Sequence, residues 1–392
     1  MVMADDSFLN IGEWPTRVCS GVGAVERLPR ICSELGVRRA LVVCGKTVAG
    51  GPILTRIRGA LGSAFAGVFD EAAAHTPIPC VERGVDAVKR LGADVVVSVG
   101  GGSTIDAAKG IAIMCASGGD LAPYAINRAM ERESLTSNGI THIAVPTTAG
   151  SSSEVMPTAG ILDPAAHKKL LFWDHLLVPQ AVILDPEMAV YAGPELTAAT
   201  GMTAVARCIE SLYSRDRNPV ATGMALHGAR LLRRSLPRSV AEPGDLGARA
   251  DCQFGCLMSG IAGINAMVSL VHAIGHVVGG RHALQHGISH AMMLGPAMRA
   301  LLPAIGEGQY LVLEAMGGRK EGQSADAAGA AAADAMVVLV ASLPLPQRLR
   351  DVGVEESELK GIAESTMDDY MMGYLPRPLS GNDVLRVVTS AY

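Results

Sequence analysis

The stretch VVVSVGGGSTIDAAKG, residues 95–110, decides the fold of this chain. Its valine run predicts a buried strand, its three glycines a tight turn, and Ser103 with Thr104 the start of a helix. Glycines allow close backbone approach, and the free amides at a helix start attract a phosphate. An ordinary strand-to-helix turn would have a similar sequence. The alternating elements around the stretch favour a phosphate-binding turn made by Gly100, Gly101, Gly102 and Ser103.

The segments on either side repeat this alternation. ALVVC at 40–44, FAGVF at 65–69 and DVVVSVG at 94–100 predict strands, and ILTRIRGAL and VERGVDAVKRLG between them have helical spacing. Short apolar strands that alternate with helices indicate a parallel sheet covered on both faces. Further strands are predicted at 142–146, 159–163 and 181–185.

After about residue 193 the strand signal disappears and Ala/Leu/Met-rich helical stretches run to the end. We therefore predict an α/β domain over residues 1–192 and an all-helical domain over residues 193–392. The polar stretch 117–140 is predicted to be an inserted loop. The Ala-rich stretch 327–343 contains Asp334 and is shorter than the ~20 residues of a membrane span, so it predicts a buried core helix.

Composition excludes several classes of partner. Lys and Arg total 33 against 38 Asp and Glu, a formal charge of -5, with no long run of either sign. This balance argues against a nucleic-acid or membrane surface and predicts a small-molecule substrate. The eight cysteines form no Cys-x-x-Cys pair, and the N-terminal MVMADDSFLN lacks a signal-peptide pattern. Both features predict a reduced, cytoplasmic protein.

A second polar motif follows the strand at 142–146. VPTTAGSSSE, residues 145–154, brings five hydroxyl side chains to the end of a strand, where loops of open α/β sheets usually meet ligands. Thr147, Thr148 and Ser152 are the predicted cofactor contacts, with a Ser/Thr-rich turn as the alternative.

Seven ordered motifs resemble the iron-dependent (group III) alcohol dehydrogenase superfamily and, within it, the maleylacetate reductase branch. They are GVGAVERLPRICSELGVRRALVV, GGGSTIDAAKG, VPTTAGSSSEV, KKLLFWDHLLVPQAVILDP, LTAATGM, HAIGHVVGG and LPRPLSGNDVL. The resemblance implies an N-terminal Rossmann-like parallel-sheet domain for NAD(P)H and a C-terminal all-helical domain, a dehydroquinate synthase-like architecture. It also implies a cleft that holds substrate and, in most members, a divalent metal, and it predicts a homodimer or higher homo-oligomer.

The helix GMTAVARCIE, residues 201–210, departs from the metal-binding pattern of these proteins. That pattern is an Asp and a His four residues apart, joined by two later histidines, which match His272 and His286 here. The first pair falls on Thr203 and Arg207. Two imidazoles form an incomplete shell and an arginine repels a cation, so we predict that no divalent metal is used. Arg207 is predicted to hold a carboxylate or a developing oxyanion. The alternative is an ion pair with Glu210.

Half of the histidines lie between residues 272 and 290, on predicted helical faces. His276 matches a family position near the nicotinamide ring and is the candidate for proton transfer. His272 and His286 are predicted to hydrogen-bond the substrate, whereas His282 and His290 are interpreted as core or surface groups. A rearranged all-histidine metal site is the alternative.

The cofactor is predicted from the first strand. In NAD-preferring relatives an acidic residue after this strand holds the ribose hydroxyls, and its place falls on Gly45. The missing carboxylate leaves room for a 2′-phosphate, which Lys46 would pair with, so we favour NADPH over NADH. Lys169 matches a family lysine near the cofactor, with a surface lysine as the alternative.

These features together predict a metal-independent NAD(P)H-dependent reductase of a small oxo-acid or related carbonyl or enone. The maleylacetate branch usually keeps the histidine that is Arg207 here, which leaves the substrate open. The alternatives are a non-redox lyase, cyclase or isomerase on the same fold, and a conventional metal-dependent dehydrogenase that uses the histidine cluster. A binding protein without catalysis ranks last.

Overall fold

A computed structural model describes residues 16–126, 131–166, 168–319 and 322–392. The N-terminal segment MVMADDSFLN, which was predicted to lack a signal peptide, lies outside these residues. Residues 127–130 of the predicted loop also lie outside them. The chain divides into two compact units, and the sequence boundary between them falls between Ala192 and Gly193.

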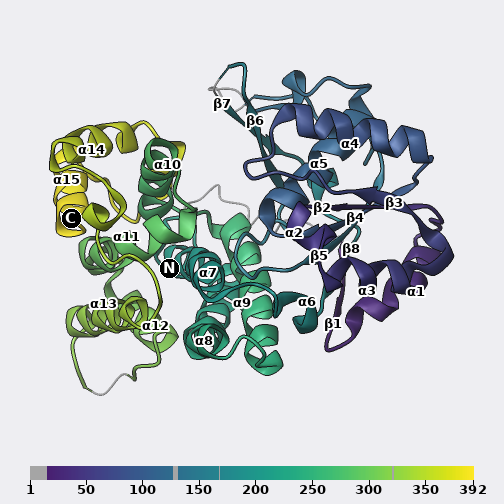
Figure 1. Ribbon diagram of the computed structural model, residues 1–392. Coiled ribbons are helices and arrows are strands. Elements are labelled where there is room, and N and C mark those ends of the chain that lie inside the picture. The colour runs from purple at the N-terminus through teal and green to yellow at the C-terminus, as the bar shows by residue number, and fades with distance from the viewer. Residues whose placement is uncertain (1–15, 127–130, 167, 320–321) are drawn as a thin grey trace. The chain divides into compact units, whose positions relative to one another are not determined.

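The first unit is built on a parallel sheet, which confirms the predicted fold class (Figure 1). In the described chain its strands lie in the order β1-β8-β5-β4-β2-β3, and all neighbours are parallel. They are β1 (Arg17–Ser20), β2 (Ala40–Cys44), β3 (Phe65–Phe69), β4 (Val95–Gly100), β5 (Thr141–Pro146) and β8 (Ala181–Leu184). Only β1 was not predicted, because this short edge strand is largely exposed and has no apolar run.

Helices cover both faces of this sheet because its strands bury side chains on both sides. Leu41, Val43 and Val96 share one core with α4 (Ile78–Leu91) and α5 (Gly102–Ser117). Val42, Val97 and Ile143 share the other core with α1 (Leu28–Glu34) and α3 (Pro52–Leu61). Shorter helices are η1 (Ala24–Arg27), α2 (Lys46–Ala49), η2 (Gly62–Ala64), η3 (Ala122–Tyr124), η4 (His175–Leu177) and α6 (Pro186–Ala189).

The strand predicted at 159–163 forms, but outside the parallel sheet. β6 (Thr158–Asp163) pairs antiparallel with β7 (Lys168–Trp173). The sequence did not predict β7, whose KKLLFW begins with two exposed lysines. Ala159 and Ile161 of β6 are buried in the same core as α4 and α5. The hairpin is thereby held against the helix that follows the glycine turn.

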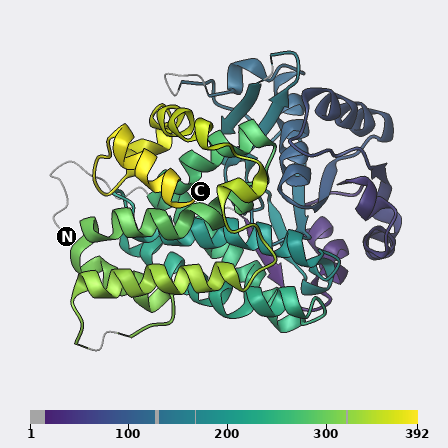
Figure 2. The same cartoon turned by 60° about the vertical axis from the view of Figure 1, so that its left-hand side comes forward.

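The second unit is helical throughout its described residues. Its helices are α7 (Pro194–Tyr213), α8 (Pro219–Ala241), α9 (Leu246–Ala266), α10 (Leu270–His282), α11 (His286–Leu301), α12 (Gln309–Ala315), α13 (Ala325–Ala341), α14 (Leu359–Met367) and α15 (Gly381–Ser390). The 3-10 helices are η5 (Leu302–Gly308), η6 (Leu349–Val352), η7 (Glu356–Glu358) and η8 (Tyr370–Tyr374). α7 packs against α8, α9 and α11, and α11 runs beside α13 (Figure 2).

Helix α13 is buried on one face only, so the prediction of a buried core helix is wrong for its other face. Val337 and Val338 are 47% and 68% exposed. Because alanines stand on all sides of this helix, the sequence pattern does not show which face is buried. Within the described residues no single helix is long and apolar enough to cross a bilayer. α9 and α10 meet that test of length and composition only when joined, and a bend of 106° separates them.

Candidate functional site

The two nucleotide motifs lie directly against each other in the first unit. β4 and β5 are parallel neighbours, so the turns that follow them emerge at the same edge of the sheet. A Cβ atom on Gly102 would lie 2.7 Å from Ser151 Cβ, and one on Gly101 would lie 3.1 Å from Thr148 Oγ1. The amide of Thr147 donates to the carbonyl of Gly100 at 3.0 Å. Side chains on these glycines would therefore fill the space between the two motifs.

The glycine turn leads into a helix long enough to bind an anion. α5 begins at Gly102, after Gly101 in an extended conformation, and spans 16 residues. Thr76 Oγ1 donates to the carbonyl of Ser103 at 2.9 Å and braces the first turn from the loop after β3. Ser152 is buried and has a left-handed φ of 57°, uncommon for a residue other than glycine. A strained, buried serine next to a helix start is consistent with a ligand-binding loop.

Two buried residues of α5, Lys109 and Asp106, hold this serine loop, and the sequence reasoning missed both. Lys109 is fully buried and its Nζ donates to Ser153 O at 2.6 Å, Met156 O at 2.7 Å and Thr158 O at 2.7 Å. Asp106 accepts from Ser153 Oγ at 2.5 Å. Burial lowers the pKa of Lys109 to about 8, against the raising influence of Asp106. The available signal was two charged residues three apart on an otherwise apolar helix.

The predicted cofactor-selecting residues lie after β2, beside the end of β3. Gly45 precedes α2, and Lys46 Nζ lies 2.8 Å from Asp70 Oδ2 in a largely exposed ion pair. A carboxylate from the neighbouring strand thus lies beside the lysine that was predicted to meet a 2′-phosphate. Lys169 extends over Gly160, whose amide donates to Asp106 Oδ2 at 3.1 Å. This hydrogen bond connects the hairpin to α5.

In the second unit, four of the five clustered histidines form a continuous row. The ring centroids of His272 and His290 are 4.2 Å apart, those of His290 and His286 6.0 Å, and those of His286 and His276 5.9 Å. His282 ends α10 and lies apart from the row, 3.2 Å from Glu358 Oε1. Because α11 begins at His286, His282 does not share its helical face as the pattern suggested.

Two carboxylates hold imidazoles at opposite ends of this row. Glu210 of α7 is fully buried and bonds to His272 Nδ1, while its Oε1 accepts from Val271 N at 2.8 Å and Ser269 Oγ at 3.1 Å. Asp369 Oδ2 lies 2.8 Å from His276 Nδ1. Neither carboxylate was predicted to act in the site, because each lies more than 60 residues from its histidine in sequence.

Arg207 lies in the interior beside the buried end of the row. It is 7% exposed, and its Nη1 donates to Ser259 Oγ of α9 at 3.0 Å. Burial lowers the pKa of His272, and burial together with neighbouring histidines lowers that of His290 well below its usual value. The charge of Arg207 adds to both shifts. Glu210, the alternative partner of Arg207 from spacing, is bonded to His272, Ser269, Val271 and Tyr213.

The donors around Arg207 do not suit a divalent cation. No group of three or more His, Cys, Asp or Glu side chains in the described residues is arranged to hold a metal. Thr203 Oγ1 donates to Ala199 O at 3.5 Å, within its own helix. Among the same residues, His272 Nε2 and both ring nitrogens of His290 are buried without a hydrogen-bond partner. The charge of Arg207, which acts on both rings, favours an anionic or polar ligand over a cation.

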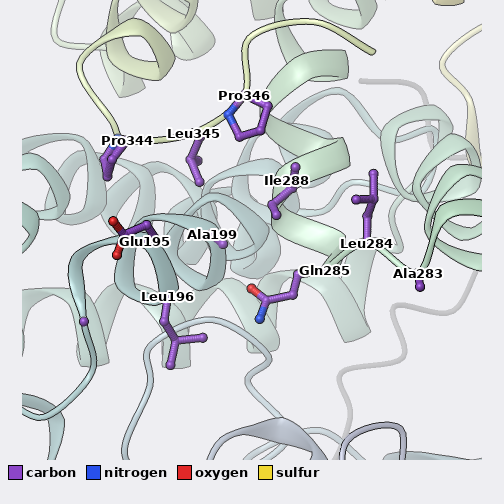
Figure 3. Close-up of a pocket in the computed structure, with 11 residues that line it drawn as sticks. Glu195, Leu196, Ala199, Ala283, Leu284, Gln285, Ile288, Pro344, Leu345 and Pro346 are labelled. Atoms are coloured by element: carbon purple, nitrogen blue, oxygen red, sulfur yellow. The ribbon is translucent and has the colours of Figure 1, made fainter. Parts of the chain in front are cut away.

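A hollow of about 540 Å³ lies near the starts of α7 and α11 (Figure 3). Leu196, Ala199, Leu284, Ile288 and Leu345 contribute apolar walls, and Glu195 and Gln285 add polar groups. None of the predicted catalytic residues lines it. The hollow therefore does not define the candidate site.

Comparisons with known proteins cover nearly the whole chain. Residues 15–186 match the family described as iron-containing alcohol dehydrogenase, and residues 197–392 match the C-terminal part of the Fe-containing alcohol dehydrogenase family. An NAD-dependent methanol dehydrogenase of Bacillus methanolicus is 30% identical over 95% of this chain and 97% of its own length. Maleylacetate reductase 2 of Cupriavidus pinatubonensis is 35% identical over 72% of this chain and 70% of its own. The crystal structure of a 1,3-propanediol oxidoreductase superposes with a TM-score of 0.91 at 30% identity, covering 97% of this chain and 98% of that one.

Proposed function

Because the chain belongs to the iron-containing alcohol dehydrogenase family, we propose that it is an NAD(P)H-dependent reductase of a small carbonyl compound that bears a carboxylate. We further propose that it works without the divalent metal of the family. The observation that carries both proposals is the buried guanidinium of Arg207 beside the imidazoles of His272 and His290. A relative 35% identical to the chain bears the name maleylacetate reductase.

The residues of the first unit suit a dinucleotide. Gly101 and Gly102 leave space that Cβ atoms would fill, and the start of α5 presents free amides to a phosphate. Thr147 and Thr148 would contact the rest of the nucleotide, whereas Ser152 is fully buried, and Lys46 would pair with a 2′-phosphate, which favours NADPH. When bound, the nicotinamide supplies a hydride.

Arg207 is proposed to bind the substrate carboxylate or the oxygen that becomes negative during reduction. A guanidinium can form two parallel hydrogen bonds to a carboxylate, and a buried cation acts in a low-dielectric setting. Removing one such donor typically costs about 10²–10³ in turnover. His272 and His286 would add hydrogen bonds, and Glu210 holds the His272 ring by its Nδ1 atom. His276, which is partly exposed, would deliver the proton to the substrate oxygen.

The first experiment is a calorimetric titration of NADPH, and of NADH in parallel, into chelator-treated protein. Tight binding, stronger for NADPH, followed by oxidation of NADPH with oxo-acids including maleylacetate, is the expected result. If neither nucleotide binds, redox chemistry is excluded and the non-redox alternative takes its place. If turnover appears only after a divalent ion is added back, the histidine row is a metal site and the metal-independent proposal fails.

Arg207→Ala tests the role of the guanidinium. Turnover should fall about 10²-fold or more while NADPH affinity stays unchanged. Arg207→Lys should recover only part of the loss, because an ammonium cannot form the paired hydrogen bonds. Arg234→Ala, at an exposed arginine of α8, is the matched control and should behave as the wild type. Native turnover in Arg207→Ala would refute the proposed role.

A further inference from the structure

We propose that Asp369 is a positioning residue that sets the tautomer of His276 and so makes it able to donate a proton. This inference rests on the proposed function, in which His276 is the proton donor. Asp369 directly precedes η8 and His276 lies on α10, 93 residues earlier. Asp369 Oδ2 and His276 Nδ1 are 2.8 Å apart.

Both carboxylate oxygens of Asp369 lie within hydrogen-bonding distance of a nitrogen. Oδ1 accepts the backbone amide of Met371 at 2.9 Å and caps η8, and Oδ2 faces the imidazole. Burial raises the pKa of Asp369, but the hydrogen bonds from His276 and Met371, with the charges of His276 and His272, outweigh it and the pKa is lowered overall. An ionised carboxylate only accepts hydrogen bonds. The hydrogen must therefore sit on His276 Nδ1, and Nε2 is the nitrogen available for chemistry.

Exposure distinguishes this pair from the Glu210–His272 pair. The His276 side chain is 36% exposed whereas that of Asp369 is 13% exposed, so the carboxylate lies behind a ring that a ligand can reach. The side chains of His272 and Glu210 are 9% and 0% exposed. The arrangement at His276 is thus suited to exchanging a proton with a ligand and with water.

The proton step follows from this geometry. As the carbonyl carbon accepts a hydride, the carbonyl oxygen gains electron density and takes the proton from Nε2 of protonated His276. The N–H bond of Nε2 breaks and an O–H bond forms. The neutral imidazole keeps its proton on Nδ1, hydrogen-bonded to Asp369, and water later returns a proton to Nε2.

Asp369→Asn tests the assignment while keeping the helix cap. The amide oxygen must stay on the Met371 N–H, which needs an acceptor, so the amide NH₂ group turns toward His276. That group donates to Nδ1 and forces the hydrogen onto Nε2, the opposite tautomer. In ¹⁵N-histidine spectra of the nucleotide-bound protein, recorded at a pH where His276 is neutral and assigned with His276→Gln, the lone-pair signal should move from Nε2 to Nδ1. The kcat should fall about 10²-fold or more, with the KM for NADPH unchanged.

Two further variants separate positioning from general damage. Asp369→Glu keeps the acceptor and should restore the wild-type tautomer and part of kcat. Asp368→Asn changes an exposed neighbour and should match the wild type in both readouts. An unchanged tautomer in Asp369→Asn, or an unchanged kcat, would overturn the proposal. If the wild type reduces no oxo-acid, the proposed function fails, while the spectra still decide whether Asp369 sets the tautomer.

Discussion

The side chain of Arg207 occupies the space that a Cβ atom on Gly263 would fill. Such an atom would lie 2.6 Å from Arg207 Cδ and 2.9 Å from its Cγ, closer than real carbon atoms approach. Gly263 lies on α9, the helix that also supplies Ser259 to the guanidinium. The absence of a side chain at Gly263 therefore leaves the space that the Arg207 side chain occupies.

Gly263→Ala should displace Arg207 and lower turnover at least tenfold, while NADPH affinity is retained. Overpacking of this kind typically costs about 1–3 kcal/mol of stability. Gly223→Ala, at a helical glycine of α8 where an added Cβ atom would have no neighbour within 4 Å, is the matched control and should be neutral or stabilising. Steady-state kinetics and urea unfolding measure both. Full turnover in Gly263→Ala would show that turnover does not depend on the present position of the Arg207 side chain.

Restoring the two substituted ligand positions should create a metal site. Thr203→Asp with Arg207→His places a carboxylate and an imidazole four residues apart on α7, and removes the repelling charge beside His272. Metal analysis after dialysis against Zn²⁺ should find one ion per chain in the double variant and none in the wild type. A metal-free double variant would mean that these α7 positions do not face His272.

Lys109→Met should destabilise the first unit and weaken nucleotide binding. The change leaves one buried carbonyl group, of Ser153, and two part-buried ones, of Met156 and Thr158, without this donor. An orphaned buried acceptor costs about 1–3 kcal/mol, so a loss of at least about 1 kcal/mol is expected in urea unfolding. Lys89→Met on α4 is the exposed control. Wild-type NADPH affinity in Lys109→Met would show that the serine loop does not depend on this lysine.

His142 should make stability depend on acid pH. Burial, with the charge of Lys109, lowers its pKa from 6.5 to about 3. Between these values the unfolded chain binds a proton that the folded chain does not. The free energy of unfolding therefore falls as pH drops, by up to about 1.4 kcal/mol per pH unit.

His142→Leu should flatten this slope between pH 6 and pH 4 in denaturant titrations. His272 and His290 are shifted in the same direction, so part of the slope should remain. The exposed His227→Gln should leave the slope of the wild type intact. Equal slopes in His142→Leu and the wild type would contradict the assignment.

Lys46 and Asp70 should set the preference between the two nucleotides. Lys46→Ala should weaken NADPH binding roughly tenfold and leave NADH binding unchanged, because only NADPH carries the 2′-phosphate. Asp70→Asn should strengthen NADPH binding, since it frees the lysine from its present partner. Parallel calorimetric titrations measure both nucleotides. An equal loss of NADH affinity in Lys46→Ala would mean that the lysine contacts a part of the cofactor that NADH and NADPH share.

Much of the first unit followed from local sequence patterns. The valine run of β4, the glycines after it and the helical spacing of α5 are adjacent in the chain, and apolar strands alternating with helices have few ways to pack. The patterns failed where packing decides. β1 is an exposed edge strand without an apolar run, and β6 pairs with β7 because its side chains bury against α4 and α5.

By itself the sequence determined the alternating elements, the family and the presence of arginine at position 207, since each is contained in contiguous residues. Only the tertiary structure decided which carboxylate meets which imidazole. Glu210 meets His272 and Asp369 meets His276 across 62 and 93 residues. Spacing along a helix offered Glu210 as the alternative partner of Arg207, but a buried carboxylate bonds to the donors that packing brings to it. Helix packing places those donors on other elements, so hydrogen-bond partners in a core cannot be read from one segment alone.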